Sequence, residues 1–441
     1  MTEVSVEQSA ARPIPAQSSI QPTSLAQRLV IGRMEKLKHG SLTFNDRGAT
    51  ETFGDTSADL NATVTINDAG VYQRMLTGGS LGAADAYLDG DWDCDDLTNV
   101  IRVFARNLDV SSEQSNRASA FFARIASKAM HWFNRNTKSG SRRNIEAHYD
   151  LGNDFFKLFL DETMMYSSAV FEDSSMTLAQ ASTAKLDRIC RKLQLGPSDH
   201  VVEIGTGWGG FAHHAAANYG CKVTTTTISK EQHSWAVDRI KSAGLNDRVE
   251  ILLEDYRDLT GQYDKLVSIE MIEAVGAQFL DTYFRKCGSL LKSDGAMALQ
   301  GIVMPDQRYA SYLKSVDFIQ KYIFPGGALP SVSKMLNVVA ADTDMRLVHL
   351  EDIAAHYART LVEWRERFNE QLDEVRLQGF PERFIRMWNY YFCYCEAGFE
   401  ERTTGTSQLV FAKPKSKHET AQNDRVAERI QNQLSVASGG R

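Results

Sequence analysis

Short hydrophobic runs alternate with helical patterns over residues 144–413. Five of these runs have the length of buried strands: His200–Ile204, Lys222–Thr227, Val249–Leu253, Lys265–Ile269 and Ala296–Leu299. Strands that alternate with helices form βαβ units, in which parallel strands are covered by helices on both faces. The pattern therefore predicts an α/β domain with a Rossmann-like, mostly parallel sheet over residues 144–413.

Residues 25–112 show short strand-like runs mixed with a helical pattern. Strand-like runs lie at residues 41–44 and 62–66, a helical pattern begins at Val71, and glycines at positions 78, 79 and 90 separate them. This pattern predicts a small N-terminal α+β domain over residues 25–112. Residues 1–24 contain three prolines and many small polar residues, so we expect a disordered leader there and a polar tail over residues 414–441.

A basic segment, residues 113–143, joins the two predicted domains. After Glu113 it has no acidic residue and seven basic ones: Arg117, Arg124, Lys128, Arg135, Lys138, Arg142 and Arg143. At about 100° per residue, four of these fall on one face of a helix, beside an apolar face. Such a basic amphipathic helix suits an anionic membrane surface, and it also suits a linker packed on the core; the two interpretations are compatible.

The composition narrows the class of protein. The chain has 441 residues, 43% of them hydrophobic, and its 49 Lys and Arg against 56 Asp and Glu give a net charge of −7, which argues against a general nucleic-acid binder. Six scattered cysteines form neither a disulfide framework nor a zinc spacing, so we expect a cytoplasmic protein without a metal. No run reaches about 18 apolar residues, so any contact with the inner face of the membrane is expected to be peripheral.

A glycine-rich turn follows the first strand of the α/β domain. It reads Glu203-Ile-Gly205-Thr-Gly207-Trp-Gly209-Gly210 and leads into a helical pattern. Glycines let the backbone approach a nucleotide-like ligand at a helix N-terminus. A dinucleotide site would also need an acid at the end of the second strand, where the chain has Thr225-Thr-Thr-Ile-Ser229. The turn therefore favours S-adenosylmethionine over NAD.

Several motifs, taken in order, resemble those of the cyclopropane-fatty-acyl-phospholipid synthases. They are His148–Phe156, Met165–Ala169, Glu203–Gly210, Thr227–Gln232, Glu254–Asp258, Glu270–Gly276 and Lys321–Gly327. In addition, Gly79–Gly90 resembles part of the accessory domain of the longer bacterial members. The resemblance covers nearly the whole chain and implies a class I methyltransferase fold behind an N-terminal accessory lipid-binding domain.

This resemblance implies an enzyme that transfers the methyl group of S-adenosylmethionine to the cis double bond of an unsaturated phospholipid acyl chain. A carbocation then closes to a cyclopropane. The implied cofactor-binding residues are Tyr166, Ser167, Glu203, Gly205, Gly207, Gly209, Thr227, Ser229, Gln232, Asp255 and Tyr256. The implied catalytic residues match those that hold a bicarbonate base in the family: Glu273, Tyr357, Ser168, Gln300 and Ile302.

Two of these positions depart from the family pattern. Ser168 stands where a cysteine is common, and only backbone contacts are needed there. Gln300 stands where the family has a histidine, and the loss of a charge-assisted bond weakens the hold on an anion by about 1–3 kcal/mol. Bicarbonate therefore remains one option for the base, and a methylated or methylene-bearing acyl product remains open beside the cyclopropane.

Two other functions compete with this one. A small-molecule methyltransferase on the same fold would need neither the N-terminal domain nor the basic segment, and a non-enzymatic binding protein would need neither Glu273 nor Tyr357. The aromatic segment Phe384–Tyr394 is either a core helix or a wall of the acyl pocket. The expected partners are an unsaturated phospholipid bilayer and its anionic surface, with a homodimer open and no nucleic acid.

Overall fold

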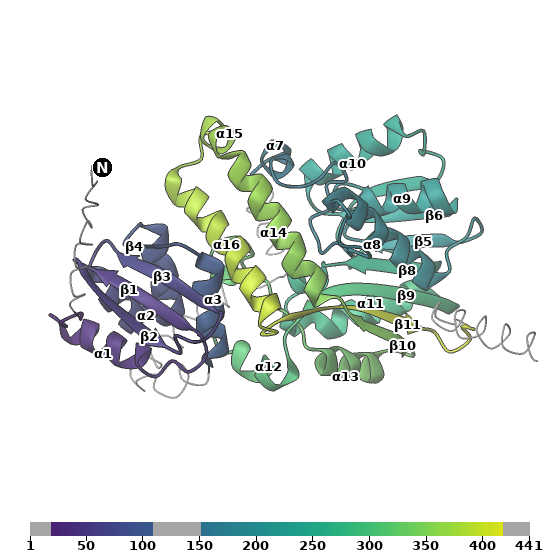
Figure 1. The fold of residues 1–441 in the computed structure, drawn as a ribbon. Helices are drawn as coiled ribbons and strands as arrows, with labels where there is room; N and C mark the ends of the chain where they lie inside the picture. Colours follow the sequence, from purple (N-terminus) through teal and green to yellow (C-terminus); the bar gives the residue numbers. More distant parts are fainter. Residues whose placement is uncertain (1–18, 109–150, 418–441) are drawn as a thin grey trace, which may run out of the picture. The chain divides into compact units, whose positions relative to one another are not determined.

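The computed structural model describes residues 19–108 and 151–417. The chain forms two compact units that divide at residue 113 (Figure 1). Each unit has its own sheet and its own buried side chains.

The N-terminal unit is a small α+β domain, as predicted. Its elements are α1 (Leu25–Met34), β1 (Ser41–Asp46), β2 (Ala49–Gly54), β3 (Asn61–Ile66), α2 (Gly70–Leu88), β4 (Trp92–Cys94) and α3 (Leu97–Arg106). The sheet order is β2-β1-β3-β4, and only the β1–β3 pair is parallel. Leu42 and Phe44 of β1 are buried, and Tyr72 of α2 donates a hydrogen bond to Asp46 at 2.9 Å.

The second unit contains a seven-stranded sheet of order β10-β11-β9-β8-β5-β6-β7. The strands from β5 to β9 run parallel, whereas β11 pairs antiparallel with both β9 and β10. The strands are β5 (His200–Ile204), β6 (Lys222–Thr227), β7 (Val249–Leu253), β8 (Tyr263–Ile269), β9 (Leu291–Val303), β10 (Arg346–Asp352) and β11 (Gly405–Ala412). The mostly parallel Rossmann-like sheet is thus confirmed.

Helices cover both faces of this sheet, because neighbouring apolar residues of each strand point to opposite sides. Val201 packs in one cluster with α8 (Leu178–Leu193), α9 (Gly210–Tyr219) and α10 (Lys230–Ser242). Val202 packs in the other cluster with α11 (Leu280–Leu290) and α13 (Val332–Asp342). The remaining short helices are α7 (Asn153–Lys157), η1 (Ile272–Ala274), η2 (Ala277–Phe279), α12 (Asp306–Tyr312), the π-helix η3 (Ile319–Ile323) and α15 (Leu372–Leu377).

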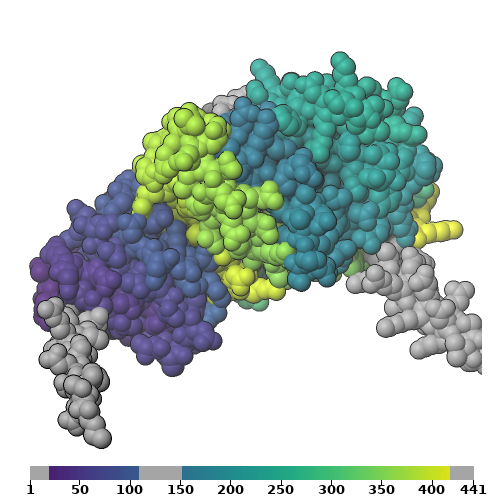
Figure 2. Space-filling model, turned by 45° about the horizontal axis from the view of Figure 1, so that its top comes forward, coloured from purple at the N-terminus to yellow at the C-terminus, as the bar shows by residue number. Residues whose placement is uncertain are grey.

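Two long helices, α14 (Ala354–Glu370) and α16 (Glu382–Glu400), lie side by side next to α7 (Figure 1). Figure 2 shows this yellow-green segment against the blue surface of the residues that follow 150. The ring of Phe155 on α7 contacts Phe368 of α14 and both Phe384 and Trp388 of α16. The aromatic segment of α16 is therefore part of a core, which is one of its two predicted roles.

The predicted strands at 200–204, 222–227 and 249–253 match β5, β6 and β7, and the other two lie inside β8 and β9. The antiparallel strands β10 and β11 were not predicted. Residues 1–18, 109–150 and 418–441 lie outside the described residues, and with them most of the predicted leader, all of the basic segment and most of the polar tail. The predicted domain boundaries and the lipid-binding role of the N-terminal domain stay predictions.

Candidate active site

The predicted site residues gather at the carboxyl ends of the parallel strands, where open α/β sheets bind ligands. Glu203 lies in β5 and the glycine turn follows that strand, Thr227 ends β6, Asp255 follows β7 and Glu270 follows β8. Strand β9 contributes Gln300 and Ile302 from within its length, α14 contributes Tyr357, and the loop at 164–171 contributes Tyr166, Ser167 and Ser168.

The glycine turn has the backbone that a cofactor cradle needs. Gly205 has a φ of +101°, and a Cβ atom there would lie 3.2 Å from the side chain of Met271. Helix α9 begins at Gly210, where a Cβ atom would lie 2.5 Å from the sulfur of Met165. The indole of Trp208 donates to Asn153 at 2.6 Å, which fastens the turn to α7. The turn therefore fits an S-adenosyl group, with free amides at the start of α9.

Three predicted cofactor residues meet between β6 and α10. Ser229 is the N-cap of α10 and accepts a hydrogen bond from the Gln232 amide at 3.3 Å. The Thr227 hydroxyl hydrogen-bonds with the Gln232 side chain at 3.1 Å and accepts from the Ser229 amide at 3.1 Å. These contacts hold the turn after β6 in place. A dinucleotide-binding site would have an acidic residue in this turn, and the chain has none there.

Asp255 and Tyr256 lie in the loop after β7. The buried Asp255 carboxylate accepts two hydrogen bonds from the Arg257 guanidinium, at 2.7 and 2.6 Å. The Tyr256 ring packs edge-on against Tyr283 of α11, and burial raises the pKa of its hydroxyl. Both residues are thus held in place, and their contact with adenine stays a prediction.

The loop that contains Tyr166 and Ser167 is held by contacts with buried side chains. Ser167 is buried and accepts a hydrogen bond from the Lys185 ammonium of α8 at 2.7 Å. The Tyr166 hydroxyl lies 3.1 Å from that of Tyr391 on α16, and its ring contacts Trp364 of α14. The loop thus connects the cofactor side of the site with the aromatic core.

Lys185 is a buried cation that the sequence did not single out. Burial lowers its pKa to about 8, although the nearby carboxylates of Glu270, Asp161 and Glu203 oppose that shift. Burial also raises the pKa of Glu203 to about 8, against a hydrogen bond of 2.6 Å from Thr225. Glu203 is therefore part of a buried polar cluster within the sheet.

Glu270 lies at the centre of the predicted catalytic residues, although it was not among them. Its Oε1 accepts hydrogen bonds from the Ser168 amide at 3.0 Å and from Gln300 Nε2 at 2.7 Å. Its Oε2 accepts one from the Tyr357 hydroxyl at 2.8 Å. Three residues predicted to hold a bicarbonate ion therefore hold a carboxylate of the chain itself.

Glu273 has a different environment. Its Oε1 accepts a hydrogen bond from the Ile302 amide, and within the described chain its buried Oε2 has no hydrogen-bond partner. Burial and, after it, the charge of Glu270 together raise the pKa of Glu273 to about 8. A Cβ atom at Gly301 would lie 2.9 Å from Ile272 Cγ2 and in ordinary contact with Glu273 Oε1, at 3.5 Å, so the glycine is needed by the neighbouring Ile272 rather than by the carboxyl group.

The structure thus brings all five predicted catalytic residues together but divides them between two carboxyl groups. Ser168, Gln300 and Tyr357 contact Glu270, and Ile302 contacts Glu273. A bicarbonate ion does not fit among the first three as well, because their donors are engaged and a second anion would meet the charge of Glu270. The use of bicarbonate, which the sequence left open, therefore stays a prediction.

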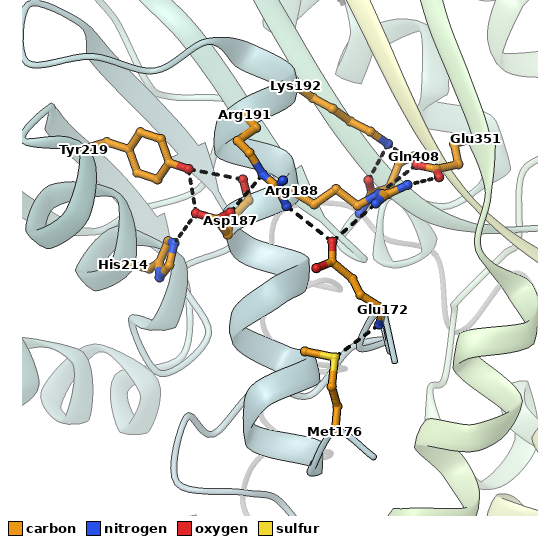
Figure 3. Close-up of polar contacts among 10 residues, drawn as sticks. All are labelled: Glu172, Met176, Asp187, Arg188, Arg191, Lys192, His214, Tyr219, Glu351 and Gln408. Atoms are coloured by element: carbon orange, nitrogen blue, oxygen red, sulfur yellow. Dashed lines mark hydrogen bonds and ion pairs between the residues drawn. The ribbon is translucent and has the colours of Figure 1, made fainter. Parts of the chain in front are cut away.

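A chain of polar side chains leads from Glu270 across the sheet to α8. Gln408 of β11 donates from Nε2 to Gln300 Oε1 at 2.9 Å, and Lys192 of α8 donates to Gln408 Oε1 at 2.6 Å. Figure 3 shows the far end of this chain, where Lys192 and Arg188 both reach Glu351 of β10. Burial would raise the pKa of Glu351, but these two cations lower it to about 2.

Sequence reasoning missed Glu270, Lys185 and Gln408. For Glu270 a signal was present, because the motif Glu270-Met-Ile-Glu273 places two carboxyl groups after one strand. Lys185 and Gln408 gave no local signal, since their partners lie 18 and 108 residues away in sequence.

Comparison with known proteins identifies the family. Residues 136–409 match the family model of mycolic acid cyclopropane synthetase. The chain belongs to this family. It is 38% identical to the cyclopropane-fatty-acyl-phospholipid synthase of Escherichia coli strain K12 over 363 residues, which are 82% of this chain and 89% of that protein. It is 40% identical to the tuberculostearic acid methyltransferase UfaA1 of Mycobacterium tuberculosis, over 74% of this chain and 77% of that protein.

A solved structure shows the same fold. The mycolic acid cyclopropane synthase CmaA1, crystallised with SAH and CTAB, superposes with a TM-score of 0.58 at 30% identity, over 62% of this chain and 98% of that one. The class I methyltransferase fold is therefore confirmed. Family and fold together show a methyltransferase that uses S-adenosylmethionine and acts on lipid.

Proposed function

We propose that this enzyme methylates the cis double bond of an unsaturated phospholipid acyl chain and closes the product to a cyclopropane through a carbocation. The observation that carries this proposal is a pair of carboxyl groups, those of the partly buried residues Glu270 and Glu273, beside a wall of aromatic rings. The Tyr357 ring stacks on Phe399 and meets Trp364 edge-on, and Trp364 in turn contacts Tyr166. An apolar wall next to a proton acceptor suits an alkene that becomes a cation and then loses a proton.

When bound, S-adenosylmethionine supplies an electrophilic methyl group. The chain's own residues supply the surroundings that a weak alkene nucleophile needs. The glycine turn and the loop at Tyr166 and Ser167 orient the reactants, while the aromatic rings exclude water and turn their negative faces to the developing positive charge. The carboxyl groups supply the proton acceptor without which a ring cannot close.

A methylated or methylene-bearing product is the second candidate. Two observations favour it: Gln300 replaces a histidine of the resembled synthases, and a relative at 40% identity is named as a tuberculostearic acid methyltransferase. The cyclopropane and the methylene product share the methyl transfer and differ only in how the cation loses its proton, whereas a saturated methyl branch would also need a hydride donor. The choice of product is therefore an outcome of the same experiment.

The test incubates the purified protein with methyl-labelled S-adenosylmethionine and vesicles of a monounsaturated phospholipid, and reads the lipids by mass spectrometry. Label in the acyl chain supports the proposal, with vesicles of the saturated analogue as the matched control. Mild hydrogenation then separates the products, because a methylene group takes up hydrogen and a cyclopropane resists. An unlabelled lipid fraction would contradict the proposal.

The enzyme is also proposed to work at the anionic surface of the inner membrane face. Among the residues that the structure describes, no helix has the length and apolarity needed to cross a bilayer. Contact with the bilayer is assigned to the basic segment, residues 113–143, whose sequence combines a cationic and an apolar face.

A further inference from the structure

The carboxylate of Glu270 has the contacts of a tightly held anion. The donors come from three separate parts of the fold: the Ser168 amide, the Gln300 side chain on β9 and the Tyr357 hydroxyl on α14. Three hydrogen bonds to one carboxylate favour its ionised form, and the nearby charge of Lys185 acts in the same direction. Burial opposes both and raises the pKa of Glu270.

The polar chain across the sheet fixes the direction of the bond from Gln300. An ammonium group only donates, so Lys192 requires the oxygen of Gln408 to face it. The Gln408 nitrogen must then face the Gln300 oxygen, which leaves the Gln300 nitrogen to face Glu270. The row of polar side chains therefore turns the Gln300 nitrogen, a donor, toward residue 270. The side chain at 270 must then be a hydrogen-bond acceptor, as the carboxylate of Glu270 is.

The backbone at Glu270 is a third, independent observation. Its φ is +48°, in the left-handed region that glycine occupies without strain and that costs other residues about 1 kcal/mol or more. The next residue, Met271, packs against Gly205 of the cofactor turn. A side chain retained at a strained position beside the cofactor site indicates a function for that side chain.

We propose that Glu270 is the general base of the reaction and takes the place of a bound bicarbonate ion. This inference rests on the proposed function. After methyl transfer, the Glu270 carboxylate accepts a proton from the new methyl group, and the electrons of that C–H bond form the bond to the cationic carbon. Glu270 leaves the step as a neutral acid and returns its proton to water after product release. If the cation first moves to the methylated carbon, the same proton transfer gives the methylene product.

Glu273 has a separate part in this arrangement. Two carboxyl groups so close together share their ionisation, and the one with fewer donors is the one that stays protonated. Glu273 accepts a hydrogen bond from the Ile302 amide, and within the described chain its Oε2 has no hydrogen-bond partner. The neutral Glu273 then leaves the negative charge on Glu270.

The experiment compares the wild type with Glu270→Gly and Glu270→Gln in buffer freed of carbon dioxide, with and without added bicarbonate. We expect the wild type to methylate and convert lipid at a rate that bicarbonate does not change. Glu270→Gly suits the positive φ, so it folds, loses about 100-fold or more in rate, and recovers when bicarbonate enters the vacated donors. Glu270→Gln is equally slow but is not rescued, because its amide still fills the space.

The matched control is Gln194→Gly at the end of α8, another non-glycine residue with a positive φ, of +54°. Its rate should equal that of the wild type. A second readout does not need turnover: labelled bicarbonate, followed by carbon NMR, should bind Glu270→Gly and not the wild type. In all variants the affinity for S-adenosylmethionine should stay within a few fold.

The outcomes separate the two proposals. A wild type that labels lipid only when bicarbonate is added, or a Glu270→Gly enzyme that keeps its rate without bicarbonate, overturns Glu270 as the base and leaves the proposed function intact. A wild type that labels no lipid under either condition overturns the proposed function and the base assignment with it.

Discussion

At the scale of single residues, the orientation of Gln300 decides what its neighbour can be. A histidine could bind a free anion, whereas the Gln300 amide is one link between Lys192 and Glu270. In the sequence, Gln300 in place of a histidine weakened the case for a bound bicarbonate ion. In the structure, Gln300 faces the carboxylate of Glu270, and a neutral amide is a sufficient donor for it. Gln300 and Glu270 therefore belong to one arrangement.

Changing Gln408 should test this link without touching the reacting groups. In Gln408→Met the Gln300 amide is no longer oriented, so Glu270 loses a donor, its pKa rises and the rising limb of the pH–rate profile moves to higher pH. The titratable groups near Glu270 include Lys185, Glu273, Tyr357 and Tyr391, and all four are unchanged in the variant. We expect a lower kcat at pH 7 that recovers at higher pH.

Gln408→Glu makes a sharper comparison. It keeps the contact with Lys192 but offers an acceptor to Gln300, which turns the Gln300 oxygen toward Glu270. The rate should therefore fall further than in Gln408→Met. Equal pH profiles in both variants and the wild type would show that Gln408 has only a structural role.

The raised pKa of Glu273 predicts a pH-dependent stability. Its folded-state value of about 8 exceeds the reference value of 4.5, so between these pH values the folded state binds more protons and stability falls as pH rises. Glu273→Gln should reduce the fall in Tm between pH 5 and pH 8. Because its amide is neutral, as the protonated Glu273 is, turnover should fall far less than in Glu270→Gln, and cofactor affinity should change by a few fold at most. Glu203 remains, so part of the slope persists.

Thermal unfolding followed by circular dichroism at both pH values checks the slope. The control is Glu374→Gln on α15, which replaces an exposed carboxyl and should leave the slope as in the wild type. A Glu273→Gln slope equal to that of the wild type would mean that Glu273 titrates normally in the folded chain.

At the scale of elements, the helix α16 has the packing of a core helix. Trp388 is almost fully buried and contacts Phe155 of α7, Phe159 and Phe368 of α14. The same helix reaches the site through Tyr391, whose hydroxyl meets that of Tyr166. Stability and site geometry therefore depend on one element.

We expect Trp388→Ala to cost about 3–5 kcal/mol in the free energy of unfolding, because it removes a large ring from the centre of a close-packed cluster. Urea unfolding followed by tryptophan-independent far-UV circular dichroism measures the loss. Leu377→Ala, at a residue that is 80% exposed, is the control and should change the free energy little. A loss below 1 kcal/mol for Trp388→Ala would argue that the cluster is loosely packed.

The sequence predicted elements well where the evidence was local. The strands β5, β6 and β7 are bounded by glycines and polar turns, and their limits were predicted to the residue. The burial of β7 was not, because it is the edge strand of the sheet and only Val249 in it is buried. Strand β11 pairs with β9 more than 100 residues earlier, and only this pairing distinguishes it from a buried helix segment. In the site, the glycine turn was predictable for the same reason, whereas Glu270 depends on a backbone angle that no pattern of residue types reveals.

At the scale of the whole molecule, charge is unevenly distributed along the chain. The net charge of −7 coexists with a stretch of about thirty residues that has seven basic side chains and no acidic one after Glu113. That stretch lies outside the described residues. Its role at the membrane is therefore tested by measuring how the protein binds to vesicles.

Reversing the charge of Arg124, Lys128 and Arg135 to glutamate should weaken binding to vesicles that contain anionic lipid. Because the attraction is screened by salt, the loss should be large at low ionic strength and small at high ionic strength. The control reverses three exposed lysines, Lys241, Lys334 and Lys417, which changes the net charge equally. Co-sedimentation with vesicles measures the binding of both triple variants. If the two triple variants lose binding alike, overall charge explains the attraction; if the first loses none, the segment serves as a linker alone.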